Sequence, residues 1–134
     1  MIQELELKNF RKHTNKTLTF TGGLNILRGA NEQGKTTILE SILYAMFGAR
    51  SLREPLSEVV TTGEPENSLK VSLKFQLDGV DYRIVRGASG AELTYGTQSV
   101  TGQTGVKVFM ENLLRVNADT ACKLLFANQD SVRG

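Results

Sequence analysis

The stretch Gly29-Ala30-Asn31-Glu32-Gln33-Gly34-Lys35-Thr36 decides the fold, because it fits the pattern G-x-x-x-x-G-K-[ST] in full. Glycines let backbone amides turn inward around an anion, and a following helix adds the positive end of its dipole. In this pattern Lys35 reaches the outer phosphates of a nucleotide, and the Thr36 hydroxyl can ligate Mg²⁺. A glycine-rich turn that only joins two elements would explain Gly29 and Gly34, but not a lysine and a hydroxyl at these two positions. The stretch therefore predicts a nucleotide site.

The residues on either side of this loop fit the same prediction. Residues 24–27 form a short apolar run typical of a buried strand. After the loop, apolar residues at spacings of three and four predict a helix from Lys35 that stops near Gly48. This apolar stripe contains Ile38, Leu39, Ile42, Leu43, Ala45, Met46 and Phe47. We expect Tyr44, Met46 and Phe47 to belong to the core.

Strand patterns precede and follow that helix. Alternation in the first ten residues and again at residues 17–20 predicts two short paired strands. Residues 69–77 alternate strictly, and Asp78-Gly79 leads into a second alternating run, which is the strongest hairpin signal in the chain. A third strand is expected around residues 92–101.

The remaining segments carry weaker signals. Residues 49–68 are mixed and polar, so we expect a loop with one helical turn. Thr104 is a candidate cap for a helix whose apolar stripe contains Val106, Phe109, Met110, Leu113 and Leu114. Near the end, residues 117–127 indicate a cap, a short helical turn and a buried strand.

Composition limits the function classes. The chain has 134 residues, 40% of them apolar and 22% charged, which is typical of one globular domain. Cys122 is the only cysteine, so an intrachain disulfide or a cysteine-based zinc site is excluded. The net charge of +2 is too small to predict a nucleic-acid partner by itself. Without a secretory pattern or a long apolar run, we expect a soluble cytoplasmic protein with no membrane partner.

Several segments together resemble a known family. Residues 7–13, 18–20, 23–27 and 37–48, with the loop between them, resemble the amino-terminal lobe of an SbcC-type DNA repair ATPase, a relative of the SMC and RecF proteins. The likeness continues more loosely to the end, through the run Tyr82-Arg83-Ile84-Val85-Arg86 and Gln129. The resemblance implies an α/β fold of the P-loop NTPase class, the ABC-type ATPase head. Its amino-terminal lobe has a mixed or antiparallel β-meander with flanking helices.

The resemblance also implies roles for particular residues. Arg11 would lie near the nucleotide phosphates, and Gln129 would belong to the glutamine loop that senses Mg²⁺ and the attacking water. Lys35 and Gln129 would be the catalytic residues, and Thr36 and Gln129 would contact the metal. The full set expected to bind ATP is Arg11, Asn31, Glu32, Gln33, Gly34, Lys35, Thr36 and Thr37.

Two departures from the family pattern bear on these roles. Glu32 stands where SbcC and SMC loops usually have glycine, and it brings a negative charge to a site for anions. A glutamate there also occurs in the YhaN-like branch, so the superfamily is unaffected but the branch is not decided. Gln129 is followed by Asp130-Ser131 where the family usually has Gly-Glu, and its alternative interpretation is a cap for the next helix.

The 134 residues contain neither an apolar strand ending in Asp-Glu nor a Ser-Gly-Gly signature, which an ATPase of this class needs. In SbcC-type proteins these elements lie in a carboxy-terminal lobe beyond a long coiled coil. We therefore expect residues 1–134 to be one domain, a nucleotide-binding lobe truncated before that coiled coil, with weak ATP binding and almost no turnover.

The expected function is ATP-driven head dimerisation in DNA double-strand end processing with an SbcD-like nuclease. The expected partners are the carboxy-terminal lobe, a second ATPase head, the nuclease and DNA, with this chain as part of an exonuclease subunit. The expected location is the cytoplasm, which is the host cytoplasm if the gene is from a phage. Lys70 and Lys74 could contact DNA phosphates, with a solvated surface as the alternative. Two other functions stay open: an SMC-, RecF- or YhaN-like ATPase with another DNA role, and a P-loop regulatory switch, for which no guanine-reading motif is present.

Overall fold

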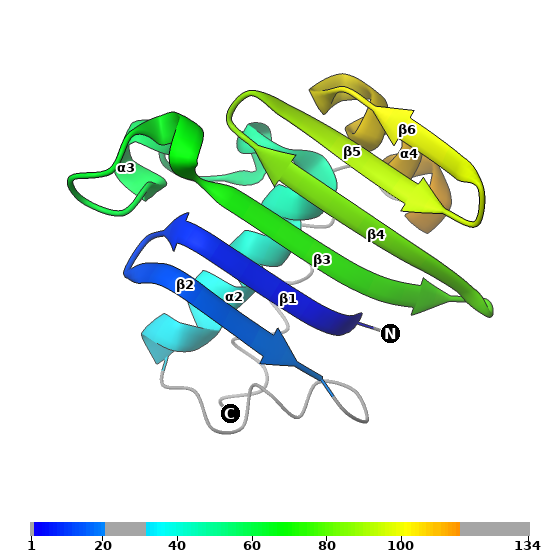
Figure 1. The fold of residues 1–134 in the computed structure, drawn as a ribbon, viewed down its shortest axis with the longest axis horizontal. Helices are drawn as coiled ribbons and strands as arrows, with labels where there is room; N and C mark the ends of the chain where they lie inside the picture. Colours follow the sequence, from blue (N-terminus) through cyan, green and yellow to red (C-terminus); the bar gives the residue numbers. More distant parts are fainter. Residues whose placement is uncertain (1, 21–31, 116–134) are drawn as a thin grey trace.

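The computed structural model describes residues 2–20 and 32–115, with the side chains of residues 32–35 left outside that description. Their main feature is a six-stranded sheet in the order β2-β1-β3-β4-β5-β6, in which every neighbouring pair is antiparallel (Figure 1). The strands are β1 Ile2–Phe10, β2 His13–Thr19, β3 Lys70–Leu77, β4 Val80–Gly87, β5 Gly90–Tyr95 and β6 Gln98–Thr101.

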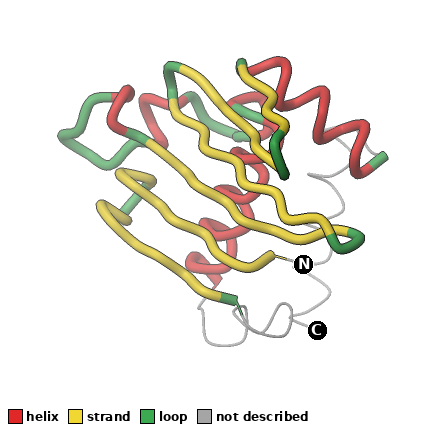
Figure 2. Tube along the Cα trace, turned by 45° about the vertical axis from the view of Figure 1, so that its right-hand side comes forward, coloured by secondary structure: helices red, strands yellow, loops and turns green. Residues whose placement is uncertain are grey.

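The two long helices cover one face of this sheet (Figure 2). Helix α2, Glu32–Phe47, crosses β1, β3 and β4, and helix α4, Gln103–Leu114, packs beside it against β5 and β6. Three short helical segments connect α2 to β3: η1 Ala49–Ser51, α3 Leu56–Val59 and η2 Glu66–Ser68. The described part thus has two layers, with the opposite sheet face free of helices (Figure 1).

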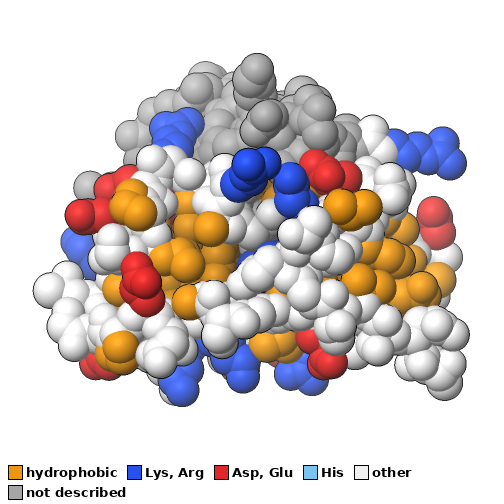
Figure 3. All heavy atoms as spheres, turned by 90° about the horizontal axis from the view of Figure 1, so that it is seen from above, with side chains coloured by type: hydrophobic (Ala, Val, Ile, Leu, Met, Phe, Trp, Pro, Cys, Tyr) orange, Lys and Arg blue, Asp and Glu red, His pale blue; other side chains and the backbone are white. Residues whose placement is uncertain are grey.

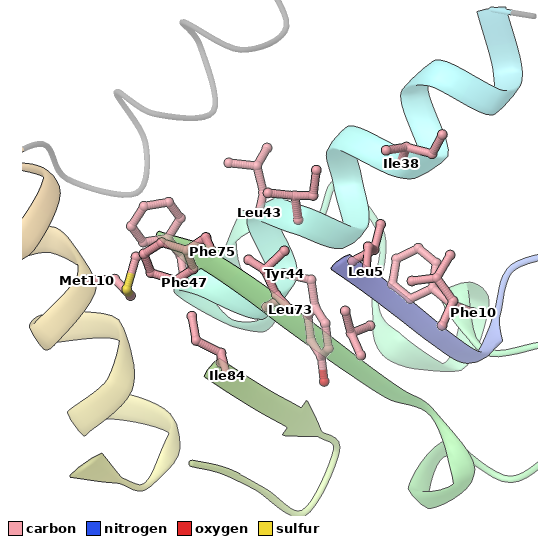
Figure 4. Packing of buried hydrophobic residues seen from close by; sticks show 14 of the residues in the cluster. Leu5, Phe10, Ile38, Leu43, Tyr44, Phe47, Leu73, Phe75, Ile84 and Met110 are labelled. Carbon is pink, nitrogen blue, oxygen red and sulfur yellow. The ribbon is translucent and has the colours of Figure 1, made fainter. Parts of the chain in front are cut away.

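The core lies between the sheet and α2 (Figure 4). Alternation in β1 and β3 points one set of apolar side chains at the helix, and Leu5 and Leu73 are fully buried there. From α2 come Leu43, Tyr44 and Phe47, each at most 2% exposed. Burial of each such side chain contributes about 1.5 to 3 kcal/mol, so this packing is what holds α2 on the sheet.

The strongest sequence predictions are confirmed. The predicted helix is present as α2, starting at Glu32 rather than at Lys35, and it ends before Gly48. The predicted hairpin joins β3 to β4 with Leu77 opposite Val80. Asp78 and Gly79 have φ of 52° and 80°, as the two central residues of a type I′ turn require.

Three weaker predictions are corrected. The single strand expected at residues 92–101 is a hairpin of β5 and β6, because Gly96, with φ of 55°, turns the chain between them. Helix α4 is capped by Gly102 and not by Thr104, which lies inside its first turn. Residues 49–68 contain three short helical segments instead of one turn. The strands predicted at residues 24–27 and 124–127 lie outside the described residues.

Candidate nucleotide-binding site

The second half of the phosphate-loop sequence forms the start of α2. The backbone of Glu32, Gln33, Gly34 and Lys35 makes the first turn of this 16-residue helix. Backbone N–H groups of a first helical turn have no partner within the helix and carry the positive end of its dipole. This turn therefore fits an anionic phosphate group, as the sequence predicts. Asn31 and Gln129 lie outside the described residues.

Thr36 and Thr37 follow in the next turn of α2. Thr36 is exposed and Thr37 is half-buried. A hydroxyl on an exposed helical turn beside the first-turn amides fits the hard oxygen ligand that Mg²⁺ prefers. Thr36 and Glu40 are four residues apart on the same helix, so their Cβ atoms lie about 6 Å apart on one face.

Arg11 reaches that face from the turn between β1 and β2. Its Nε donates to Glu40 Oε1 at 2.9 Å and its Nη2 donates to Glu40 Oε2 at 2.8 Å. Nη2 also pairs with Glu54 Oε1 at 2.6 Å. The hydrogen bonds that Arg11 donates to Glu40 raise its pKa above the usual value; partial burial acts in the opposite direction, and the bond to Glu54 adds to the rise. The guanidinium is therefore a permanent cation bound to Glu40, the residue one helical turn after Thr36.

The backbone around Arg11 is held by the segment after η1. Arg11 has φ of 56°, in the left-handed region. Its N–H donates to Val59 O at 2.7 Å, and its carbonyl accepts from Thr61 Oγ1 at 2.7 Å. Phe10 and Val60 form an isolated antiparallel bridge beside these bonds. The segment that carries Glu54 thus fixes the turn from which Arg11 projects.

The opposite end of α2 is held by Arg86 of β4, which is fully buried. Its Nε donates to Ala45 O at 2.9 Å and its Nη2 to Met46 O at 3.4 Å, so it binds carbonyls that the helix end leaves unpaired. Its Nη1 donates to Gln103 Oε1 at 2.5 Å, and Gln103 Nε2 donates in turn to Gly87 O at 2.8 Å. Arg86 therefore joins β4, α2 and α4.

Sequence reasoning did not single out Arg86, although one signal was present. In β4, the buried Tyr82, Ile84 and Arg86 alternate with residues that are exposed or half-buried, so the pattern already placed the arginine on the buried face. Burial lowers the pKa of Arg86 to about 10, which still leaves it charged at neutral pH. Tyr44 lies in the same core, and burial raises its pKa to about 12, while the nearby Arg86 acts in the opposite direction.

The helix-free face of the sheet carries charged side chains in register. Lys8 lies opposite Lys70, and Lys74 lies opposite Arg83, with all four exposed. Like charges directly opposite each other destabilise a sheet, but Lys74 also lies opposite Glu4 of β1, and this opposite-charge pair offsets part of the repulsion. Glu4 and Glu6 of β1 lie on the same face. Seen from above, at right angles to the view of Figure 1, the surface likewise carries Lys and Arg side chains close to Asp and Glu (Figure 3).

Two negative findings concern the described residues alone. Among residues 2–20 and 32–115 no group of three or more His, Cys, Asp or Glu side chains is placed to hold a metal ion. In the same part of the chain, no helix has the length and apolar character needed to span a membrane.

Comparison with known proteins shows which family the chain belongs to. The sequence matches the AAA domain family over residues 4–131. It is 34% identical over 114 residues to a DNA double-strand break repair Rad50 ATPase of Archaeoglobus fulgidus, a match that covers 85% of this chain and 13% of that protein. It is 37% identical over 78 residues to the DNA replication and repair protein RecF of Tropheryma whipplei, covering 56% of this chain and 21% of that protein.

Among solved structures, the recombination mediator protein RecF with ATP matches with a TM-score of 0.51 and 19% sequence identity, over 79% of this chain and 29% of that one. This likeness shows a shared fold and confirms the expected P-loop class. The chain spans only 13% of the length of the Archaeoglobus relative. It belongs to the AAA domain family within the SMC/RecF superfamily, and it resembles the amino-terminal region of Rad50/SbcC-type ATPases.

Proposed function

We propose that the chain is the ATP-binding lobe of an SbcC-type ATPase that acts in DNA double-strand end processing and repair. The observation that carries this proposal is the start of α2, where the phosphate-loop sequence forms the first helical turn, with Arg11 bound to Glu40 of the same helix. Backbone amides of a first helical turn, a hydroxyl in the next turn and a guanidinium on the same helix are groups that a nucleoside triphosphate requires, and Lys35 of the motif adds the lysine.

Each residue has a stated role in the proposed site. Lys35 and the amides of Glu32, Gln33 and Gly34 bind the phosphates, together with Asn31 and Thr37. Thr36 supplies a hydroxyl oxygen to Mg²⁺, and Gln129 orients the attacking water near that ion. When bound, Mg²⁺ would neutralise negative charge on the phosphates. Arg11 contributes a further positive charge from the turn between β1 and β2.

The proposal extends to partners and place of action. The relatives named above are DNA repair proteins by name, and one is called an ATPase. We propose that the lobe works with a carboxy-terminal lobe, that ATP brings two heads together, and that an SbcD-like nuclease acts on the DNA in the cytoplasm. Because the 134 residues lack the Asp-Glu and Ser-Gly-Gly elements, the isolated chain should bind ATP weakly and turn it over very slowly.

Calorimetric titration of the chain with ATP and Mg²⁺ tests the nucleotide site. Lys35→Ala should weaken binding at least about tenfold, because a charge-assisted phosphate contact contributes about 1.5 to 3 kcal/mol. Lys16→Ala is the control, since Lys16 is an exposed lysine of β2. ATP binding that Lys35→Ala leaves unchanged would contradict the proposal.

The paired cations of the helix-free sheet face are the proposed DNA contacts. Each phosphate neutralised adds about 0.9 to the slope of log K against log salt concentration. The double variant Lys74→Ala/Arg83→Ala should therefore reduce that slope by about 2 for duplex DNA. Lys107→Ala, on α4 at the other face, should leave it unchanged. An unchanged slope in the double variant would assign DNA binding to another surface.

A further inference from the structure

The two carboxylates that hold Arg11 are unequal. The Glu40 side chain is 9% exposed and uses both oxygens on Nε and Nη2. The Glu54 side chain is 47% exposed and places one oxygen on Nη2. A half-exposed carboxylate is readily hydrated when it leaves its partner, so its release costs little free energy. A buried carboxylate that loses its partner is left as an uncompensated charge, which is costly. Glu54 is therefore the partner that another anion can replace.

The charge of this group also favours replacement. One guanidinium and two carboxylates sum to a net charge of −1 at neutral pH. Glu40 alone balances Arg11, so Glu54 adds an unbalanced negative charge beside the guanidinium. An arriving phosphate is repelled by this charge, and it competes with Glu54 for the Nη2 donor.

The fold determines where Glu54 can go. It lies between η1 and α3, in a segment bound to the β1–β2 turn through Val59 and Thr61. These bonds use backbone groups of Arg11 and Asn9, not the Glu54 side chain. Glu54 can thus release the guanidinium by rotating into solvent while the segment stays in place.

We propose that Glu54 is a positioning residue that holds Arg11 in the nucleotide-free lobe and is displaced from it by the terminal phosphate of a bound nucleoside triphosphate. This inference rests on the proposed ATP site. Its consequence is that Glu54 lowers the affinity for a triphosphate more than the affinity for a diphosphate, because the terminal phosphate carries the competing charge. Glu40 remains bound to Arg11 in both states and keeps the guanidinium on the α2 face.

The test compares ATP and ADP affinities, measured with Mg²⁺ by calorimetry on the whole chain. Glu54→Gln should tighten ATP binding about threefold to fivefold, the size of an exposed ion pair, and change ADP binding less than about twofold. Glu58→Gln is the matched control, an exposed glutamate of α3. In an Arg11→Met background the gain for ATP should disappear.

A second variant separates contact from charge. Glu54→Asp keeps the negative charge but shortens the side chain by one methylene, so it should also tighten ATP binding if the contact with Nη2 is what matters. Equal ATP affinities for Glu54→Gln, Glu58→Gln and the wild type would overturn the inference, provided that binding still depends on Lys35. Absence of Lys35-dependent ATP binding in the wild type would instead overturn the proposed function itself.

Discussion

Replacing Gly48 tests the contact that holds the carboxyl end of α2. Gly48 has φ of 93° and ψ of −169°, a backbone conformation essentially limited to glycine. A Cβ at this position would lie 2.9 Å from Arg86 Nη1. Arg86 cannot move aside easily, because it is fully buried and donates to Ala45 O and Gln103 Oε1. Gly48→Ala therefore combines backbone strain with displacement of a pinned guanidinium.

The expected loss follows from these two contributions. The strained backbone costs about 1 to 3 kcal/mol, and weakening hydrogen bonds to a charged group costs about 1.5 to 3 kcal/mol. Together, Gly48→Ala should lower the free energy of unfolding by about 2.5 to 6 kcal/mol, a large part of the stability of a domain this size. Urea unfolding followed by circular dichroism measures this change.

Gly63→Ala is the matched control. Gly63 has φ of 88°, similar to that of Gly48, but a Cβ there would meet nothing within 4 Å. The control should lose only the strain contribution, about 1 to 3 kcal/mol. In an Arg86→Met background, the excess cost of Gly48→Ala over Gly63→Ala should shrink. Equal losses for the two glycine variants in the wild-type background would refute the argument that Arg86 constrains this position.

Three further predictions concern the same core. In the described part of the chain the buried Tyr44 hydroxyl has no hydrogen-bond partner, so Tyr44→Phe should raise the unfolding free energy by about 1 kcal/mol, and a clear loss would reveal a partner. Burial raises the pKa of Tyr44 from 10.0 to about 12, so the folded state retains this proton longer and stability should fall with pH across that interval. Arg86, whose pKa burial lowers to about 10, acts in the opposite direction, because its titration makes stability rise with pH above pH 10. Urea unfolding at a series of pH values should therefore show that the unfolding free energy of Tyr44→Phe falls less, or rises more, with pH than that of the wild type. Gln103→Leu should cost about 1 to 3 kcal/mol, because Arg86 Nη1 and Gly87 O lose a partner, and an unchanged urea midpoint would show that these bonds contribute nothing.

Patterns within short stretches of sequence predicted most of the elements. The apolar spacing of α2 and the alternation around Asp78-Gly79 depend on neighbours within a few residues, and both predictions are confirmed. The β5–β6 hairpin was missed because its turn, Gly96-Thr97, carries no strong hairpin dipeptide and β6 is only four residues long. Thr104 failed as a cap because α4 already begins at Gln103, with Gly102 at the N-cap position, so Thr104 lies inside the first turn.

The sequence by itself determined the nucleotide-site motif and the family likeness, since the spacing of Gly29, Gly34, Lys35 and Thr36 is a local property of the chain. Only the tertiary structure decided which side chains hold the middle and the carboxyl end of α2. Arg11 meets Glu40 across 29 residues of sequence, and Arg86 meets Ala45 across 41. Such pairs form because sheet register and helix packing bring distant segments together. The residues next to a charged side chain in the sequence do not indicate which distant group will compensate for its burial.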